Sequence, residues 1–345
     1  MPHTFGPQKK KPSSQVRKAL VSTGPVVLST LVMAIALFSL PSILSFDLRA
    51  DELSQRAKAP FPVSVDPARK VIVESPTADA LLREGTNPAL SAAATQASTF
   101  IAWLASKIAD FPVYRLLAGA DVNFVTIQPG YRQEQVASAF ASSLGWSVKE
   151  RQAFLANVKS TPPTLSEGEF VPGTYEVHGA MTPTEVQNML NDRFTAEILN
   201  RYSTTTSEQV PLMDALTIAS LIERETGGTD DMRMISGIIW NRLFVNMNLQ
   251  IDATLQYAKS ANTKSWWPPV KPADKYIKSA YNTYAHPGLP PGPIASPSVA
   301  AVIAALNPKP TDCIFYFHDK YGNFHCSENY SEHVKSLKKY YGQGK

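Results

Sequence analysis

One stretch of the sequence decides how the rest is interpreted: Leu-Thr-Ile-Ala-Ser-Leu-Ile-Glu-Arg-Glu-Thr-Gly-Gly, from Leu216 to Gly228. Its apolar residues recur at helical spacing, and the glycine pair at its end commonly terminates a helix. Glu223 and Glu225 therefore lie in the last turn of a predicted helix. The helix dipole places partial negative charge at that end, which disfavours carboxylates. Some other feature of the protein must keep them there.

The two glutamates leave this helix in different directions. Glu225 continues an apolar stripe, because the residues seven, four and three positions before it are Ile218, Leu221 and Ile222. A carboxyl group on an apolar face near a helix C-terminus is driven towards its protonated form, which is what a general acid requires. The alternative is that both acids are solvated and paired with Arg224 or Arg242. The segment alone leaves both interpretations open.

The composition is that of a globular protein. The chain has 345 residues, 44% of them hydrophobic, and a formal net charge of +4. Its length allows one large domain or two smaller ones with an ample core. Much of this small positive excess lies within residues 9–18, so a basic face for nucleic acid is not predicted.

Residues 19–46 contain no charged side chain and are long enough to cross a bilayer, which needs about 20 apolar residues. Basic residues precede this segment, whereas Asp47, Asp51 and Glu52 follow it. The positive-inside rule therefore predicts that residues 1–18 form a cytoplasmic tail. We expect a single-pass protein of the cell inner (cytoplasmic) membrane, anchored in the lipid bilayer, with the rest of the chain periplasmic or otherwise extracytoplasmic.

The two cysteines, Cys313 and Cys326, flank a predicted hairpin. An oxidising compartment permits a disulfide between them, but the strand register cannot be deduced from sequence. A disulfide and two free thiols are therefore both possible. The histidines nearby match no standard ligand spacing, so no metal site is predicted: His318, His325 and His333.

Upstream of the central helix, the pattern changes along the chain. Residues 47–121 are interpreted as a linker, extended at its early prolines, and a poorly defined helical region that includes a predicted helix at 91–107. A strand is predicted at 123–127, followed by helices at 133–144 and about 147–158. A strand with two short helices is the size of a small carbohydrate-binding module.

Several segments together resemble one known family. In order, they are Glu167–Val177, Ala219–Thr226, Asn241–Leu243, Leu249–Thr254, Ala280–Tyr284, Gly288–Ile294 and the tail from His325 through His333. Their order and spacing, over roughly residues 122–342, are similar to those of the membrane-bound endolytic murein transglycosylases, the YceG-like family. Agreement of several motifs in order is far more specific than any one motif.

The resemblance implies an α+β protein, with a LysM-like subdomain and connecting segment at residues 122–207 and a lysozyme-like catalytic domain at 208–345. It implies lytic cleavage of nascent peptidoglycan strands beside the membrane, without a cofactor, which leaves 1,6-anhydro-N-acetylmuramic acid ends and terminates strand elongation. The family's catalytic glutamate is the one followed by threonine, here Glu225. Membrane-bound peptidoglycan synthases are the implied protein partners.

The chemistry of the residues supports a single catalytic carboxyl. Intramolecular attack by the sugar's own 6-hydroxyl needs one residue acting twice, and Glu225 would serve first as acid and then as base. Stacking faces and amide groups suit a sugar chain, although each tyrosine could equally be packed in the fold. The expected substrate contacts are Gln250, Asp252, Tyr281, Asn282 and Tyr284.

Two other functions stay open. A muramidase-type hydrolase would use Asp252 as a second carboxylate beside Glu225, and a hydrated reducing end would identify it. A non-catalytic, membrane-anchored scaffold would bind glycan without cleaving it.

Overall fold

The computed structural model describes residues 59–85, 122–160, 165–228, 231–260 and 265–342. Within these ranges, no helix is both long and apolar enough to cross a bilayer. The predicted membrane segment at 19–46, the basic tail before it and the predicted helix at 91–107 lie outside the described residues.

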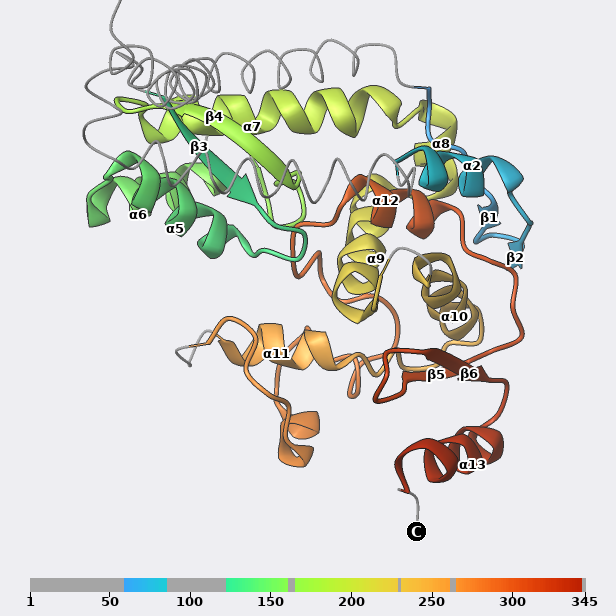
Figure 1. The fold of residues 1–345 in the computed structure, drawn as a ribbon. Coiled ribbons are helices and arrows are strands. Elements are labelled where there is room, and N and C mark those ends of the chain that lie inside the picture. The colour runs from blue at the N-terminus through green and yellow to red at the C-terminus, as the bar shows by residue number, and fades with distance from the viewer. Residues whose placement is uncertain (1–58, 86–121, 161–164, 229–230, 261–264, 343–345) are drawn as a thin grey trace, which may run out of the picture.

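The described part of the chain is mixed α and β, mostly helical, with three two-stranded antiparallel sheets. This agrees with the expected α+β class at that level. Its elements form two groups: in Figure 1 the first lies at the upper left, and the second lies to its right and below it.

The first group, called here the β3–β4 unit, contains one antiparallel pair of strands covered by helices. Its elements are β3 Val122–Ile127, α5 Gln133–Leu144, α6 Val148–Ser160, β4 Gly173–His178 and α7 Pro183–Glu197. The predicted strand and the two helices after it are confirmed, since their periodic apolar residues face a common core. Phe140, Phe154 and Phe170 are fully buried there. Their rings lie 6.5 Å and 6.4 Å apart in succession.

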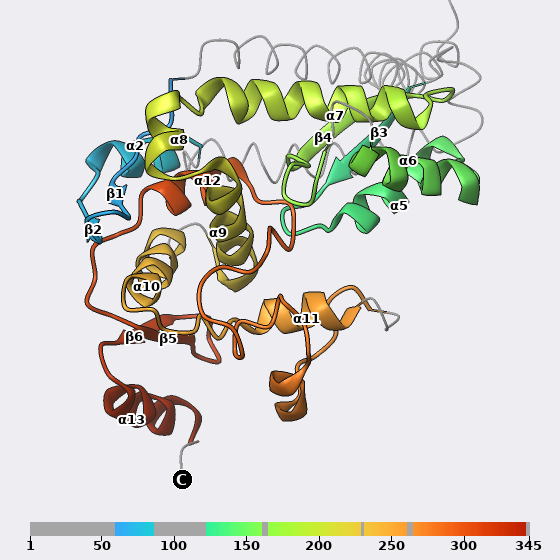
Figure 2. The same ribbon diagram turned by 180° about the vertical axis from the view of Figure 1, so that it is seen from behind.

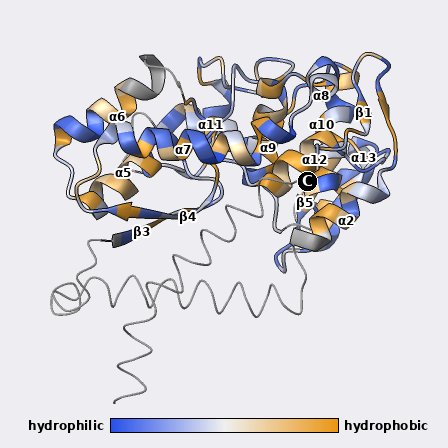
Figure 3. Cartoon of the chain, turned by 90° about the horizontal axis from the view of Figure 1, so that it is seen from above, coloured by the Kyte–Doolittle hydropathy of each residue, from blue (hydrophilic) through white to orange (hydrophobic). Residues whose placement is uncertain are grey.

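The second group, called the helical unit, is built around the helix predicted first. This helix, α9, runs from Leu212 to Glu225 and ends where the backbone of Thr226 becomes extended. It packs against α10 Met232–Phe244 and α12 Val299–Leu306, and the start of α11 Asp252–Ser260 lies near its C-terminal end. Figure 3 shows hydrophobic residues concentrated around α9 and α12.

A loop and a hairpin complete the helical unit. The 3-10 helix η2 Pro272–Tyr276 begins the loop that leads to α12, and the hairpin consists of β5 Phe315–His318 and β6 Phe324–Ser327, followed by α13 Tyr330–Tyr341. Cys313 and Cys326 form a disulfide across the open end of the hairpin, with their Cα atoms 5.8 Å apart. The register that the sequence left open pairs Tyr316 with Cys326.

Residues 59–85 differ from the extended linker expected from their prolines. They form β1 Val65–Asp66, β2 Val71–Ile72 and α2 Pro76–Gly85. Phe61, Val65 and Ala78 are buried. The buried guanidinium of Arg233 on α10 binds the carboxylates of Glu74 and Asp79. Packing on the helical unit therefore orders a segment whose local sequence favours an extended chain. Two short elements, η1 Leu199–Arg201 and α8 Thr204–Gln209, connect α7 to α9.

Candidate active site

The carboxyl group of Glu225 lies where α9, α11 and β5 meet. Glu225 is half-buried, so its carboxyl group is desolvated but still accessible to a ligand. The hydroxyl of Tyr316 on β5 donates a hydrogen bond to Glu225 Oε2 at 2.8 Å. The backbone amide of Ala253, at the start of α11, lies near enough to favour the ionised form of this carboxyl.

Burial raises the pKa of Glu225 to about 7, and the negative charge of Asp252 acts in the same direction. The Tyr316 hydroxyl, the Ala253 amide and His318 oppose the rise. A large fraction of Glu225 is therefore protonated near neutral pH. Such a group can donate a proton as an acid and take one back as a base.

The motif's other acid, Glu223, has a different role. Its Oε2 accepts hydrogen bonds from the backbone amide of Ser298 at 2.9 Å and from the Ser298 hydroxyl at 2.7 Å. Ser298 caps the N-terminus of α12, so Glu223 ties α9 to that helix. The alternative in which both glutamates are solvated and paired with arginines is wrong, because one binds Ser298 and the other binds Tyr316.

Asp252 and Tyr284 stand beside Glu225 and bind each other. The Tyr284 hydroxyl donates to Asp252 Oδ1 at 2.7 Å. Asp252 opens α11, where the helix dipole favours a carboxylate. Burial and the hydrogen bond to Asp252 raise the pKa of Tyr284. The structure therefore brings together Glu225 and two of the predicted substrate contacts.

Gln250 is exposed near the same place and has an unusual backbone. Its φ of 50° lies in the left-handed region, which costs a non-glycine residue about 1 kcal/mol. Hydrogen bonds from Gln250 N to Thr283 O at 3.0 Å and from Ile251 N to Thr283 Oγ1 at 3.0 Å hold this conformation. Strained backbone of this kind clusters at functional sites, and the side chain is free to meet a ligand.

Asn282 is fully buried, and its amide is used within the loop. The Nδ2 group donates to Lys275 O at 3.0 Å and to Ile277 O at 2.9 Å. The Oδ1 atom accepts from Tyr284 N at 3.0 Å. Asn282 thus positions Tyr284, and a direct contact between its side chain and substrate finds no support in this geometry.

Asn241 and Arg242 on α10, which the sequence singled out as a motif, anchor the chain that leads into β5. Asn241 Nδ2 donates to Thr311 O at 2.7 Å and to Cys313 O at 3.0 Å. The buried Arg242 donates from Nε to Ile314 O at 2.7 Å. The motif therefore places the strand that carries Tyr316.

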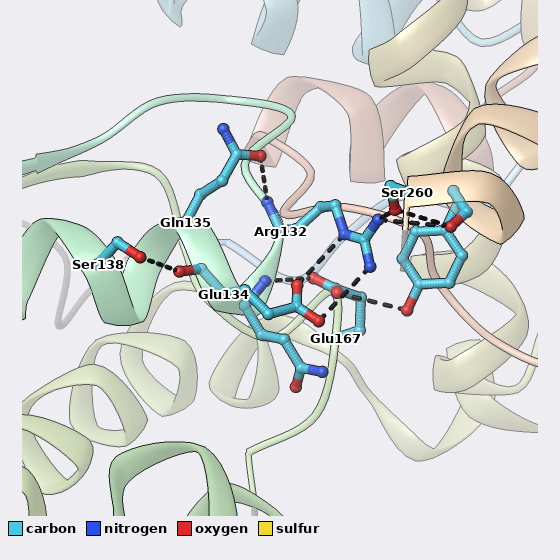
Figure 4. Close-up of polar contacts among 8 residues, drawn as sticks. Arg132, Glu134, Gln135, Ser138, Glu167 and Ser260 are labelled. Atoms are coloured by element: carbon cyan, nitrogen blue, oxygen red, sulfur yellow. Dashed lines mark hydrogen bonds and ion pairs between the residues drawn. The ribbon is translucent and has the colours of Figure 1, made fainter. Parts of the chain in front are cut away.

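Tyr281 lies apart from Glu225, in a second polar cluster between α11 and the β3–β4 unit. Its ring is 4.8 Å from that of Tyr257. The guanidinium of Arg132 lies 4.2 Å over the Tyr257 ring and also binds Glu134 and Ser260. Figure 4 shows Arg132 between the acidic residues and Ser260. We call this group the joint cluster.

Glu167 is the buried acid of the joint cluster. Its Oε1 accepts from the Gln133 backbone amide at 3.0 Å, and its Oε2 lies 3.5 Å from the Tyr257 hydroxyl. The next residue, Gly168, has a φ of 92°, and a Cβ there would lie 2.6 Å from the side chain of Pro293. Only glycine fits this approach, so the Glu167–Val177 motif and the proline-rich loop meet in the structure.

Burial, followed by the charge of Glu134, raises the pKa of Glu167 to about 8. The folded protein therefore binds a proton that the unfolded chain releases above about pH 4.5, so the carboxyl costs stability as pH rises towards 8. We expect Glu167→Gln to leave stability unchanged near pH 4 and to increase it by roughly 3–5 kcal/mol above pH 8. Urea unfolding at both pH values measures this. Glu176→Gln, on β4 outside the cluster, is the control; an equal gain there would contradict the prediction.

The sequence missed Tyr316, His318 and Asp231 as parts of the site. Tyr316 and His318 lie in the predicted hairpin, two residues apart, which places both on one face of a strand. That spacing was the available signal. Nothing local showed which face would meet Glu225.

Comparison with known proteins places this arrangement in a family. The model of the YceG-like family matches residues 92–339. An endolytic murein transglycosylase of Streptococcus pneumoniae serotype 2 is 30% identical over 245 residues, which are 62% of this chain and 44% of that protein. An endolytic murein transglycosylase of Bacillus subtilis is 30% identical over 238 residues, 63% of this chain and 64% of that protein.

The fold has a counterpart among solved structures. The crystal structure of a yceG-like protein from Listeria monocytogenes matches with a TM-score of 0.53 and 26% identity, over 62% of this chain and 75% of that one. The match spans 44% and 64% of the lengths of the two curated relatives described above, less than two thirds of either. The family match covers most of the chain, including α9 with Glu225 and the hairpin with Tyr316, and this protein belongs to the YceG-like family.

Proposed function

We propose that this chain is an endolytic lytic transglycosylase, a carbon–oxygen lyase that cleaves the glycan strands of peptidoglycan. The observation that carries the proposal is Glu225: a reachable carboxyl at the end of an apolar helix, held by Tyr316, with a pKa raised to about 7. The names of the relatives with about 30% identity agree with this activity.

The proposed reaction uses Glu225 twice. As an acid, it protonates the glycosidic oxygen, and the bond from that oxygen to C1 of N-acetylmuramic acid breaks. The N-acetyl group can stabilise the positive charge that forms at C1. The Glu225 carboxylate then takes the proton of the 6-hydroxyl, whose oxygen attacks C1. The product is a 1,6-anhydro end, and Glu225 is again protonated.

A test of this proposal is the product itself. The full chain is incubated with uncrosslinked glycan strands, and the muropeptides are analysed by mass spectrometry. We expect new ends with the mass of 1,6-anhydro-N-acetylmuramic acid. Ends that are heavier by one water would instead identify a hydrolase, and uncleaved strands that remain bound would identify a scaffold.

The hydrolase is the second candidate, because Asp252 is a carboxylate close enough to raise the pKa of Glu225. Its Oδ1 is occupied by the Tyr284 hydroxyl, which favours a positioning role.

We expect Asp252→Asn to reduce activity by less than about tenfold and to leave the ends anhydro, because no water needs activation. The change removes a negative charge near Glu225, so the pKa of Glu225 should fall and activity should be lost at lower pH than in the wild type. Rates measured between pH 5 and 9 check this. A loss of about a hundredfold or more, with hydrated ends, would favour the hydrolase.

We also propose that the protein is anchored in the cytoplasmic membrane by residues 19–46 and acts beside membrane-bound peptidoglycan synthases, where cleavage would end strand elongation. In this proposal, the β3–β4 unit is a LysM-like glycan-binding subdomain and the helical unit is the lysozyme-like catalytic part. The charge pattern around the apolar segment supports the orientation.

An alkaline phosphatase fused after Lys345 should be active in cells, because this enzyme requires export to fold. A β-galactosidase fused at the same position should be inactive. The reverse pattern would place the C-terminus in the cytoplasm and contradict the proposed location.

A further inference from the structure

The strand β5 presents two side chains to the end of α9. Tyr316 and His318 are two residues apart, and successive side chains of a strand point to opposite faces, so both lie on the same face. Tyr316 binds the Glu225 carboxyl at 2.8 Å. His318 reaches the turn that follows Glu225.

One carboxylate, that of Asp231, accepts hydrogen bonds from two residues of that turn. Asp231 Oδ1 accepts the hydroxyl of Thr226, and Oδ2 accepts the backbone amide of Gly227 at 3.2 Å. His318 Nε2 lies 2.5 Å from the same Oδ2. A Cβ placed on Gly227 would lie 3.4 Å from His318 Cδ2, so the imidazole also packs against the turn.

The turn needs such an anchor because of its sequence. Two glycines follow Thr226, and glycine loses more backbone freedom on folding than any other residue. Helix ends fray unless their groups are bound. An unanchored turn would let the last residue of α9, which is Glu225, shift relative to β5.

We propose that Asp231 and His318 are positioning residues that hold the backbone of Glu225 so that its Oε2 stays on the Tyr316 hydroxyl. The role in the reaction rests on the function proposed above, whereas the role in holding Glu225 does not. A protonated carboxyl has one hydroxyl and one acceptor oxygen. Because Tyr316 donates to Oε2, we assign the acidic proton of Glu225 to the other oxygen, Oε1.

The charges around Glu225 set the direction of the expected pH effect. Asp252 faces it from α11, Tyr284 from the following loop, Arg242 from α10 and Arg224 from its own helix, besides the two residues of β5. Among them, His318 acts on Glu225 as a positive charge and lowers its pKa. Without His318, the pKa of Glu225 should rise, and the fall in activity at high pH should begin at a higher pH.

The hairpin offers a matched control. His325 on β6 pairs with Phe317, so it lies on the opposite face from Tyr316 and His318. It also binds an aspartate, with Nε2 3.0 Å from Asp319 Oδ2. Both His318→Ala and His325→Ala therefore remove one histidine–aspartate bond from the same hairpin, but only the first bond leads to Glu225.

We expect His318→Ala to lower kcat by about 10- to 100-fold with KM within about twofold, since a misplacement near 1 Å costs that much. His318→Gln, whose amide can still donate to Asp231, should recover activity to within about threefold of the wild type. His325→Ala should keep both kcat and the pH profile. Equal losses in the two alanine variants, or an unchanged kcat and pH profile in His318→Ala, would overturn the proposal.

A second measurement does not depend on activity. NMR of the full chain labelled with [13C]glutamate, in detergent, follows the carboxyl of Glu225, which is identified by its absence in Glu225→Gln. The titration should move to higher pH in His318→Ala and stay in place in His325→Ala. If the wild type cleaves no glycan yet this shift occurs, the proposed function fails, whereas the coupling of His318 to the Glu225 carboxyl stands. If the wild type forms anhydro ends but His318→Ala shows neither this shift nor the loss of kcat, the proposal for His318 alone fails.

Discussion

Glu225→Gln is expected to remove nearly all strand cleavage, by about 10²- to 10⁴-fold, because glutamine cannot exchange the proton on which both steps depend. The variant keeps the shape of the side chain, and its carbonyl oxygen can still accept the Tyr316 hydroxyl. The protein should therefore fold as the wild type does. Above pH 7, it should be at least as stable, because the ionised carboxyl in this desolvated place is unfavourable.

The control for this result is Glu223→Gln. Its carbonyl oxygen can still accept hydrogen bonds from Ser298, so α12 stays capped and most activity should remain. Both variants are assayed on uncrosslinked glycan strands after thermal unfolding has shown equal stability. Glycan binding should persist in Glu225→Gln. The assignment is wrong if Glu225→Gln turns over near the wild-type rate, or if Glu223→Gln is the inactive one.

Loss of the disulfide is the second change with a large expected effect. Cys313 and Cys326 are 13 residues apart in sequence, and closing a loop of that size stabilises a protein by about 3 kcal/mol in the chain-entropy model. The bridged hairpin carries Tyr316 and His318. We therefore expect the double variant Cys313→Ser, Cys326→Ser to be less stable by about 2–3 kcal/mol and less active as well.

Urea unfolding with and without reductant measures the effect. The wild type should lose stability when reduced, whereas the double variant should not respond to reductant. This comparison separates the disulfide from the two serine substitutions. A wild type whose stability and activity are insensitive to full reduction, verified by thiol counting, would contradict the prediction.

The sequence by itself determined the secondary-structure elements that a local pattern of residues encodes. The apolar stripe that ends at Glu225 predicted α9, since a helix repeats every 3.6 residues and the pattern needs no knowledge of neighbours. The same periodicity predicted α5, whereas two short strand-like runs on either side of a turn predicted the hairpin around residue 320. The order of several motifs indicated the family, which the family match confirms. The apolar face also favoured desolvation of Glu225, but it left a solvated carboxyl open, and the structure decided between the two.

Tertiary structure decided what surrounds that carboxyl. Tyr316 and His318 come from a strand about 90 residues later in the chain, and no periodicity encodes which face of a strand meets a distant helix. The disulfide depended on the register of the two hairpin strands. The burial of Asn282 depended on the path that its loop takes. The short helix α12, overlooked in the sequence because eight apolar residues show no polar face, is buried by contacts with α9. These features arise where segments that are distant in the sequence pack together. The free energy of such packing depends on all the segments in contact, so no single segment encodes it.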